Sequence, residues 1–304
     1  QVIGLNPAVD VEWRVDAYNW NEKTVIQSSR SWAGGKPPNV ARWLKFLGLR
    51  SVLLVPLGGD PGRIVLGDLK KWGVRVEAVA ISEATRINVM VTPDSGHQLR
   101  FNPKGPKLSR PEWQAVFAQA VSGFGEHSLT ILSGSLPRDA NPNIHARLIK
   151  LARKHDRRIV LDCDGAALRL GAAAKPFLLK PNRFELSQWC RRELKTRRDF
   201  VAGARDLSGV TGGWVFLSLD AGGGVLVNDR DGFAATAAAP RVKALNEVGA
   251  GDALLAQLAG RVDAGDDPEN WLRWSVATGS AFVQARAGRL PKKSLIKQLA
   301  STIR

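Results

Sequence analysis

Residues 128–163, SLTILSGSLPRDANPNIHARLIKLARKHDRRIVLDC, carry the pattern that indicates the fold class of this 304-residue chain. Two short apolar runs, at 128–135 and 157–163, flank a helical pattern at 141–156. Strands that are apolar on both faces and alternate with helices are typical of a parallel sheet covered on both sides. The stretch therefore predicts one strand–helix–strand unit of an α/β fold.

The same alternation continues along the chain in both directions. Further strands are predicted at 51–57, 177–181 and 213–220, and further helices at 61–73, from 109 onward, at 253–262, 270–285 and 294–303. The helix that begins near Ser109 has Glu112 three residues later, which is the pattern of a capping box. We expect one domain, residues 1–304, with a three-layer α/β/α core and a mostly parallel sheet.

Two segments, 10–33 and 86–101, do not follow this pattern of apolar strands and helices, because apolar and polar residues alternate in them. Such alternation predicts half-exposed antiparallel strands. A small antiparallel sheet of this kind can form a lid over the open end of the parallel sheet, where ligands bind. Its apolar side chains, with Trp13, Val15 and Val25 as candidates, suggest that the lid also forms a homodimer interface.

Composition limits the classes of function. The net charge of +16 fits either a nucleic-acid-binding protein or an enzyme that acts on anions. The basic residues are scattered over helical faces, and no recognition helix is evident, so we expect no specific nucleic-acid binding.

No apolar run approaches the roughly 20 residues of a membrane span, and QVIGLNPAVD predicts a strand rather than a secretory signal. Two cysteines without metal-ligand spacing favour a reducing, cytoplasmic location.

The stretch Asn246–Asp252, NEVGAGD, precedes a long helical pattern. Glycines at a helix start let backbone N–H groups point at one spot, so Gly249, Ala250 and Gly251 could form an anion hole. Asp252 beside it could accept the proton of an attacking hydroxyl group during phosphoryl transfer. A tight turn with Asp252 as the helix N-cap explains the same residues equally well.

Two further motifs also allow a structural and a functional interpretation. In residues 31–42, SWAGGKPPNVAR, Asn39 could bind hydroxyl groups and Lys36 a phosphate, or the segment is a plain strand–turn–helix. Asn182 and Glu185 match a helix-capping pattern. Lys180 places a cation just before them, at the carboxyl end of a predicted strand, where ligands bind in open α/β sheets.

Taken together, the motifs resemble the ribokinase-like carbohydrate kinases of the phosphofructokinase-B type. The closest similarity is to the subgroup of 1-phosphofructokinase and tagatose-6-phosphate kinase. The resemblance covers essentially the whole chain and keeps the motif order of the family. The matching stretches are LNPAVD (5–10), AGGKPPNVAR (33–42), TRINV (85–89), NPKGP (102–106), SGSLP (133–137), KPN with Glu185 (180–185) and VGAGD (248–252).

This resemblance implies roles for individual residues. Asp252 would be the general base, with Gly249, Ala250 and Gly251 as the anion hole. The sugar would be held by Asp10, Gly34, Gly35, Asn39 and Ser135, and the phosphate already on the substrate by Lys36 and Arg86. The ATP side would be lined by Lys180, Asn182, Ser218, Gly223 and Ser280, with Asn182 and Glu185 organising Mg²⁺ through water. ATP and Mg²⁺ are thus the implied cofactors, and a monovalent cation is a further candidate.

The chain also departs from the family pattern near the substrate, at Val25, Pro37–Pro38, Arg100, Asp220 and Glu247. The expected reaction is phosphorylation of fructose 1-phosphate to fructose 1,6-bisphosphate by ATP, and tagatose 6-phosphate and fructose 6-phosphate are alternative substrates. A non-catalytic sugar-phosphate or nucleotide sensor on the same fold is a hypothesis of another class. Val25, Pro37–Pro38 and Arg100 are its only support, and the intact Asp252 motif argues against it.

Overall fold

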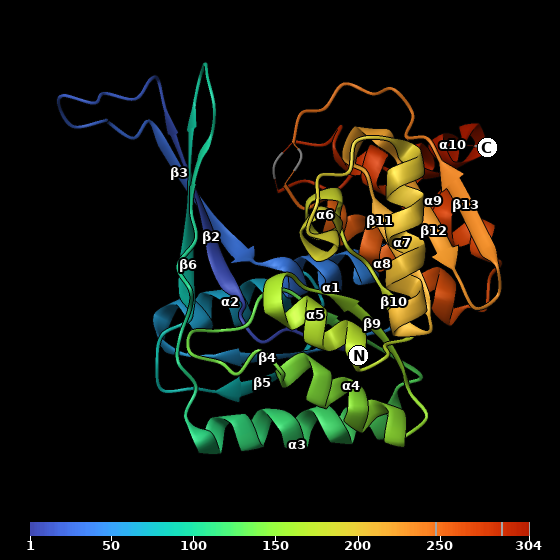
Figure 1. Ribbon diagram of the computed structural model, residues 1–304. Coiled ribbons are helices and arrows are strands. Elements are labelled where there is room, and N and C mark those ends of the chain that lie inside the picture. The colour runs from blue at the N-terminus through green and yellow to red at the C-terminus, as the bar shows by residue number, and fades with distance from the viewer. Residues whose placement is uncertain (247, 287, 304) are drawn as a thin grey trace.

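The computed structural model describes residues 1–246, 248–286 and 288–303. A large sheet lies between two layers of helices, and a second, small sheet projects from this core (Figure 1). Glu247, noted above as a departure from the family pattern, lies outside the described residues.

The large sheet is mostly parallel, as predicted. Its strand order is β13-β12-β11-β10-β9-β8-β1-β4-β5, and only β12 and β13 run antiparallel to their neighbours, at one edge. The strands are β1 (Val2–Ile3), β4 (Val52–Leu57), β5 (Arg75–Ala80), β8 (Leu129–Ser133), β9 (Arg158–Asp162), β10 (Leu178–Leu179), β11 (Trp214–Ser218), β12 (Gly224–Asn228) and β13 (Phe233–Ala237).

Helices cover both faces of this sheet, which explains why strands inside it such as β4, β8 and β9 are buried over almost their whole length. Successive side chains point to opposite faces, so Ile131 of β8 packs in one hydrophobic cluster and Leu132 in the other. One layer contains α1 (Lys36–Leu47), α2 (Gly59–Lys71), α8 (Ala250–Asp263), α9 (Pro268–Phe282) and α10 (Lys293–Thr302). The other contains α3 (Arg110–Glu126), α4 (Ile144–Lys154), α5 (Gly165–Ala173), α6 (Arg183–Cys190) and α7 (Arg197–Thr211). The capping box predicted at Ser109 and Glu112 is present.

The small sheet consists of β2 (Ala8–Val15), β3 (Ser28–Gly34), β6 (Arg86–Pro93) and β7 (Leu99–Phe101), in the order β3-β2-β6-β7. One detail of the prediction is wrong: β2 and β6 pair in parallel, and only the outer pairs β2–β3 and β6–β7 are antiparallel. The reason is connectivity, because β2 and β6 both leave the core in the same direction and are separated in sequence by β3, α1, β4, α2 and β5.

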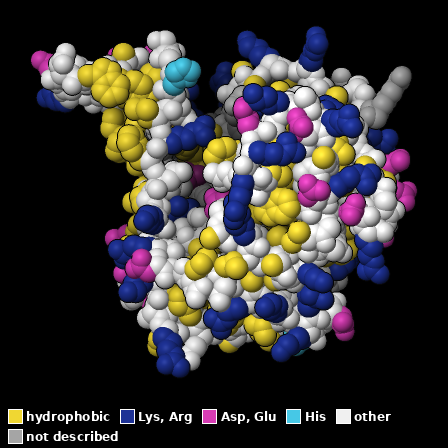
Figure 2. Space-filling model, viewed as in Figure 1, with side chains coloured by type: hydrophobic (Ala, Val, Ile, Leu, Met, Phe, Trp, Pro, Cys, Tyr) yellow, Lys and Arg dark blue, Asp and Glu magenta, His cyan; other side chains and the backbone are white. Residues whose placement is uncertain are grey.

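The two faces of the small sheet differ in chemistry. Asp10 and Glu12 are buried on the face turned to the core, and Trp13 belongs to the opposite face. On that outer face Ile87 and Phe101 are 42% and 57% exposed, whereas Val15, one of the predicted interface candidates, is buried at 1%. Val25, another candidate, is exposed in the loop between β2 and β3. The space-filling view shows the small sheet standing across a cleft from the core (Figure 2). Within the described residues, no helix has both the length and the apolar character needed to cross a bilayer.

Candidate active site

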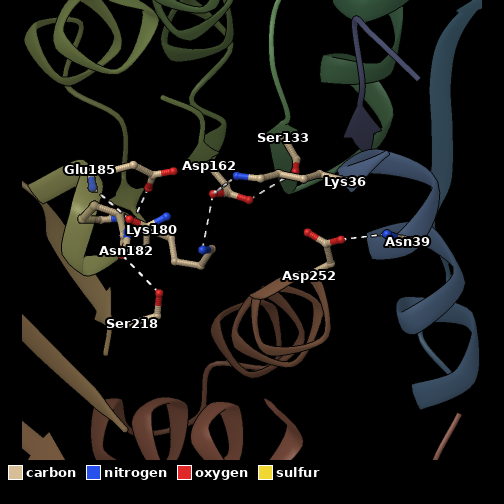
Figure 3. A network of polar contacts seen from close by, with 10 residues as sticks. Lys36, Asn39, Ser133, Asp162, Lys180, Asn182, Glu185, Ser218 and Asp252 are labelled. Carbon is tan, nitrogen blue, oxygen red and sulfur yellow. Dashed lines mark hydrogen bonds and ion pairs between the residues drawn. The ribbon is translucent and has the colours of Figure 1, made fainter. Parts of the chain in front are cut away.

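Most of the polar residues singled out in the sequence meet at the carboxyl ends of β8, β9 and β10, where α1, α6 and α8 begin (Figure 3). This end of a parallel sheet is the usual ligand-binding edge of open α/β folds. The small sheet covers the adjoining cavity, which is lined by Asp10, Glu12, Asn39, Gln98 and Gly249 among others.

Asp252 lies in the first turn of α8 and not at its N-cap. The N-cap is Gly249, whose φ of 100° is in the left-handed region that favours glycine. The Asp252 side chain is 6% exposed, and its Oδ2 accepts a hydrogen bond of 2.9 Å from Nδ2 of Asn39 on α1. The interpretation of Asp252 as a simple N-cap is therefore wrong, because its carboxylate faces another element instead of its own helix end.

Burial raises the pKa of Asp252 to about 7, although the Lys36 ammonium and the hydrogen bond from Asn39 act in the opposite direction. A carboxyl group with a pKa near neutrality can accept and release a proton under ordinary conditions. This is the property required of a general base.

Asp162, at the end of β9, is the charged centre of the site. Its Oδ1 lies 3.1 Å from Nζ of Lys36 and 3.3 Å from Nζ of Lys180, and Ser133 Oγ donates to its Oδ2 at 3.4 Å. Burial acts to raise the pKa of Asp162, but the two lysines hold it below its usual range. Asp162 belongs to none of the motifs singled out in the sequence, although a carboxylate that ends a buried parallel strand is a recognisable signal.

Lys36 and Lys180 lie between the Asp252 carboxylate and Glu185 (Figure 3). Burial acts to lower the pKa of Lys36, but the carboxylates of Asp162, Glu185 and Asp252 raise it well above its usual range. Lys36 was paired with Arg86 in the sequence analysis, and the structure places Lys36 at Asp162. Arg86 lies at the base of the small sheet, where its guanidinium donates to the carbonyl oxygens of Asn6 and Pro103.

The predicted sugar residues Asp10, Gly34 and Gly35 meet where β2 and β3 join the core. Asn88 of β6 donates to Asp10 Oδ1 at 2.8 Å, and burial raises the pKa of Asp10. A Cβ atom on Gly34 would lie 2.0 Å from Cγ of Asp10, so only glycine leaves room for this carboxylate. Asn88 lies within the stretch TRINV but was given no role from the sequence, although it follows Arg86 by two residues on the same face of β6.

Asn182 and Glu185 form the capping box of α6, which confirms the structural interpretation. Asn182 Oδ1 accepts from the Glu185 amide and Glu185 Oε2 accepts from the Asn182 amide, both at 2.8 Å. The capping box orients the carboxylate of Glu185 toward the lysines, and burial raises the pKa of Glu185.

Within the described part of the chain there is no cluster of three His, Cys, Asp or Glu side chains that could hold a metal directly. A single carboxylate beside phosphate groups fits Mg²⁺ held through water.

The remaining predicted residues are spread around this centre. Ser218 ends β11 and forms a β-bridge with Asn182. Gly223 has a φ of 91°, and a Cβ atom there would lie 2.0 Å from the Ala237 carbonyl oxygen. Ser280 is buried in α9, and Ser135 Oγ accepts from Asn6 Nδ2 at 3.1 Å. The structure therefore groups Ser218 with Asn182, whereas Ser135 lies by the loop that enters the small sheet.

The chain is similar to known proteins in both sequence and fold. The family model described as pfkB family carbohydrate kinase matches residues 10–294. The 1-phosphofructokinase of Vibrio cholerae is 31% identical over 281 residues, which span 92% of this chain and 88% of the relative. Phosphofructokinase-2 from Escherichia coli superposes with a TM-score of 0.92 in its potassium complex, at 27% identity, and 0.90 in its complex with fructose-6-phosphate, at 26% identity. Both superpositions cover 99% of this chain and 98% of the other.

The raised pKa of Asp252 predicts how stability depends on pH. Below about pH 3.9, the ordinary pKa of an unfolded Asp, Asp252 is protonated in both states and does not lower the free energy of unfolding. As pH rises from there through about 7, the unfolded chain ionises more readily than the folded one, so the free energy of unfolding falls. We therefore expect Asp252→Asn to be more stable than the wild type above pH 7, on the order of a few kcal/mol, with the difference shrinking toward pH 4. Urea unfolding between pH 4 and 8.5 measures this, with the exposed Asp94→Asn as control. A difference that does not vary with pH would contradict the raised pKa.

Proposed function

This chain belongs to the pfkB family of carbohydrate kinases, and we propose that it transfers the γ-phosphoryl group of ATP to fructose 1-phosphate, giving fructose 1,6-bisphosphate. The observation that carries the proposal is the buried Asp252 carboxyl group, whose pKa is raised to about 7, at the start of α8 and beside two lysines. The similarity to the Vibrio cholerae 1-phosphofructokinase supports the choice of substrate. Tagatose 6-phosphate and fructose 6-phosphate are the alternatives.

In this proposal Asp252 is the general base. The substrate hydroxyl group loses its proton to the Asp252 carboxylate as its oxygen bonds to the γ-phosphorus, and ADP leaves. The hydrogen bond from Asn39 supports this role because it fixes the orientation of the carboxylate. The backbone N–H groups of Gly249, Ala250 and Gly251, at the positive end of α8, would stabilise the negative charge of the transferred group.

The two lysines would serve the phosphate groups of ATP. Lys180 Nζ lies 3.9 Å from the position that a Cβ atom on Gly251 would occupy, so its cation adjoins the proposed anion hole. We assign Lys36 to the transferred phosphoryl group, because its ammonium lies at Asp162 and not at the small sheet. Arg86 then remains as the residue that holds the phosphate already on the substrate.

Glu185 and Asn182 would hold Mg²⁺ through water, and Ser218, Gly223 and Ser280 would line the ATP side. When bound, Mg²⁺ supplies positive charge that neutralises the phosphate oxygens. A monovalent cation is a further part of the proposal, supported by the potassium complex of the E. coli phosphofructokinase-2. A cytoplasmic location is supported by Cys163 and Cys190, which are both free thiols.

The first test is a panel of free sugars and sugar phosphates in an ADP-release assay. We expect fructose 1-phosphate to give the highest kcat/KM, and free fructose and ribose to be at least about 100-fold poorer, because charge-assisted hydrogen bonds from Arg86 would be lost. Equal turnover of an unphosphorylated sugar contradicts the substrate class. Preference for tagatose 6-phosphate or fructose 6-phosphate selects the alternative substrate.

The second test addresses the base. We expect Asp252→Asn to lose roughly 10²–10⁴-fold in kcat with ATP affinity nearly unchanged, because a base acts in the transition state. In the wild type, kcat/KM should fall below about pH 7, where Asp252 becomes protonated. A variant that retains a tenth of wild-type turnover, or an acid limb far from pH 7, would count against Asp252.

The third test addresses a homodimer through the outer face of the small sheet. Ile87 and Phe101 are exposed there, and covering them would remove apolar surface from water. We expect the wild type to sediment as a dimer at micromolar concentration and Ile87→Asp to sediment as a monomer. Ile64→Asp on α2 is the matched control, since Ile64 is 45% exposed and Ile87 42%. A monomeric wild type would refute the dimer and leave the kinase proposal intact.

A further inference from the structure

Glu12 is a second carboxylate in the wall of the cavity that adjoins Asp252. It follows Asp10 by two residues on β2, so both side chains lie on the face of the small sheet turned to the core. Glu12 is 6% exposed and lines the same cavity as Asp10, Asn39 and Gln98. Glu12 has no role in the proposed reaction.

The hydrogen bonding of Glu12 leaves most of its acceptor capacity unused. Thr92 Oγ1 donates to Glu12 Oε1 at 3.2 Å, and Gln98 Nε2 donates in turn to Thr92 Oγ1 at 2.8 Å. Among the described residues no ion pair to Glu12 occurs, even though Arg30 is its cross-strand neighbour on β3. A buried carboxylate costs free energy unless it is paired or hydrogen-bonded. A ligand that donates hydrogen bonds in the cavity would satisfy it.

The register of β2 and β6 orders the charges along this wall. Arg86 is opposite Ala8, Asn88 is opposite Asp10, and Met90 is opposite Glu12. Successive levels are about 6–7 Å apart, since a strand rises about 3.3 Å per residue. From the core outward the β2–β6 pair presents Arg86, then Asp10, then Glu12, and the level of Glu12 also holds Arg30 on β3 and Arg100 on β7. These two arginines offset the charge of Glu12, so what this level offers a neutral part of a ligand is a hydrogen-bond acceptor. Sugar hydroxyl groups can donate to the carboxylates of both Asp10 and Glu12.

We propose that Glu12 is a specificity-determining residue of the sugar site. It accepts hydrogen bonds from substrate hydroxyl groups in the cavity that Asp10 and Asn39 also line. This inference rests on the proposed function and deepens it, because it names a residue that selects the hydroxylated body of the sugar phosphate.

The test compares Glu12→Gln and Glu12→Ala with two matched controls. Thr92→Val removes the hydrogen bond that Thr92 donates to Glu12 and leaves the carboxylate in place. Glu22→Gln removes the same charge from an exposed position in the loop between β2 and β3. For each protein, KM and kcat are measured with fructose 1-phosphate, fructose 6-phosphate and tagatose 6-phosphate. The Kd of the best of these is measured by calorimetry without ATP, and thermal unfolding checks that each variant is folded.

We expect both Glu12 variants to raise the KM and the Kd of the best sugar phosphate roughly 10- to 100-fold, the range for a lost hydrogen bond to a charged group, with kcat within about threefold. The preference among the three sugar phosphates should narrow in Glu12→Ala. Both controls should stay within about threefold of the wild type. Unchanged Kd in Glu12→Ala overturns the inference, and so does an equal loss in Thr92→Val, which would mean that Glu12 only braces the sheet. Failure of the wild type to bind or phosphorylate any of the three refutes the proposed function itself.

Discussion

The Asp162 carboxylate is the interaction on which the arrangement of the site depends. It is buried at the end of β9 and contacts Lys36 at the start of α1 and Lys180 just after β10, both through Oδ1. Lys36 and Asp162 are 126 residues apart in sequence. Buried ion pairs contribute little net stability because desolvation offsets their attraction. The ion pairs of Asp162 instead hold the ammonium groups of Lys36 and Lys180 beside the carboxyl ends of the parallel strands.

The electrostatics of the other acidic groups follow from this arrangement. Asp252 and Glu185 lie on either side of the two lysines, and burial raises the pKa of both carboxyl groups. Asp162, in contact with both lysines, is held in its charged form. These three neighbouring carboxyl groups thus have different protonation tendencies, because burial dominates for Asp252 and Glu185 whereas Asp162 forms ion pairs with both lysines. Such separation of pKa values allows one carboxyl group to exchange a proton while another stays charged.

The small sheet adds a wall that the core cannot supply. Its parallel β2–β6 pair sends two strands outward side by side, so their alternating side chains form one polar inner face and one apolar outer face. The inner face places Asp10 and Glu12 in the cavity beside Asn39. Gly34 is required at its base because any side chain there would displace Asp10. The outer face leaves Ile87 and Phe101 exposed.

Periodicity and local motifs, which act over a few residues, were enough to predict the α/β class, the capping box of α3, the small sheet and the segments that build the site. Which interpretation of each motif holds depends on contacts between distant parts of the chain. Asp252 lies in the first turn of α8, where Asn39 of α1 donates a hydrogen bond to its carboxylate, and Lys36 contacts Asp162. The parallel pairing of β2 with β6, and the roles open to Asp162, Asn88 and Glu12, depend on contacts between segments far apart in sequence. No local pattern encodes such contacts, because they arise from the packing of the whole chain.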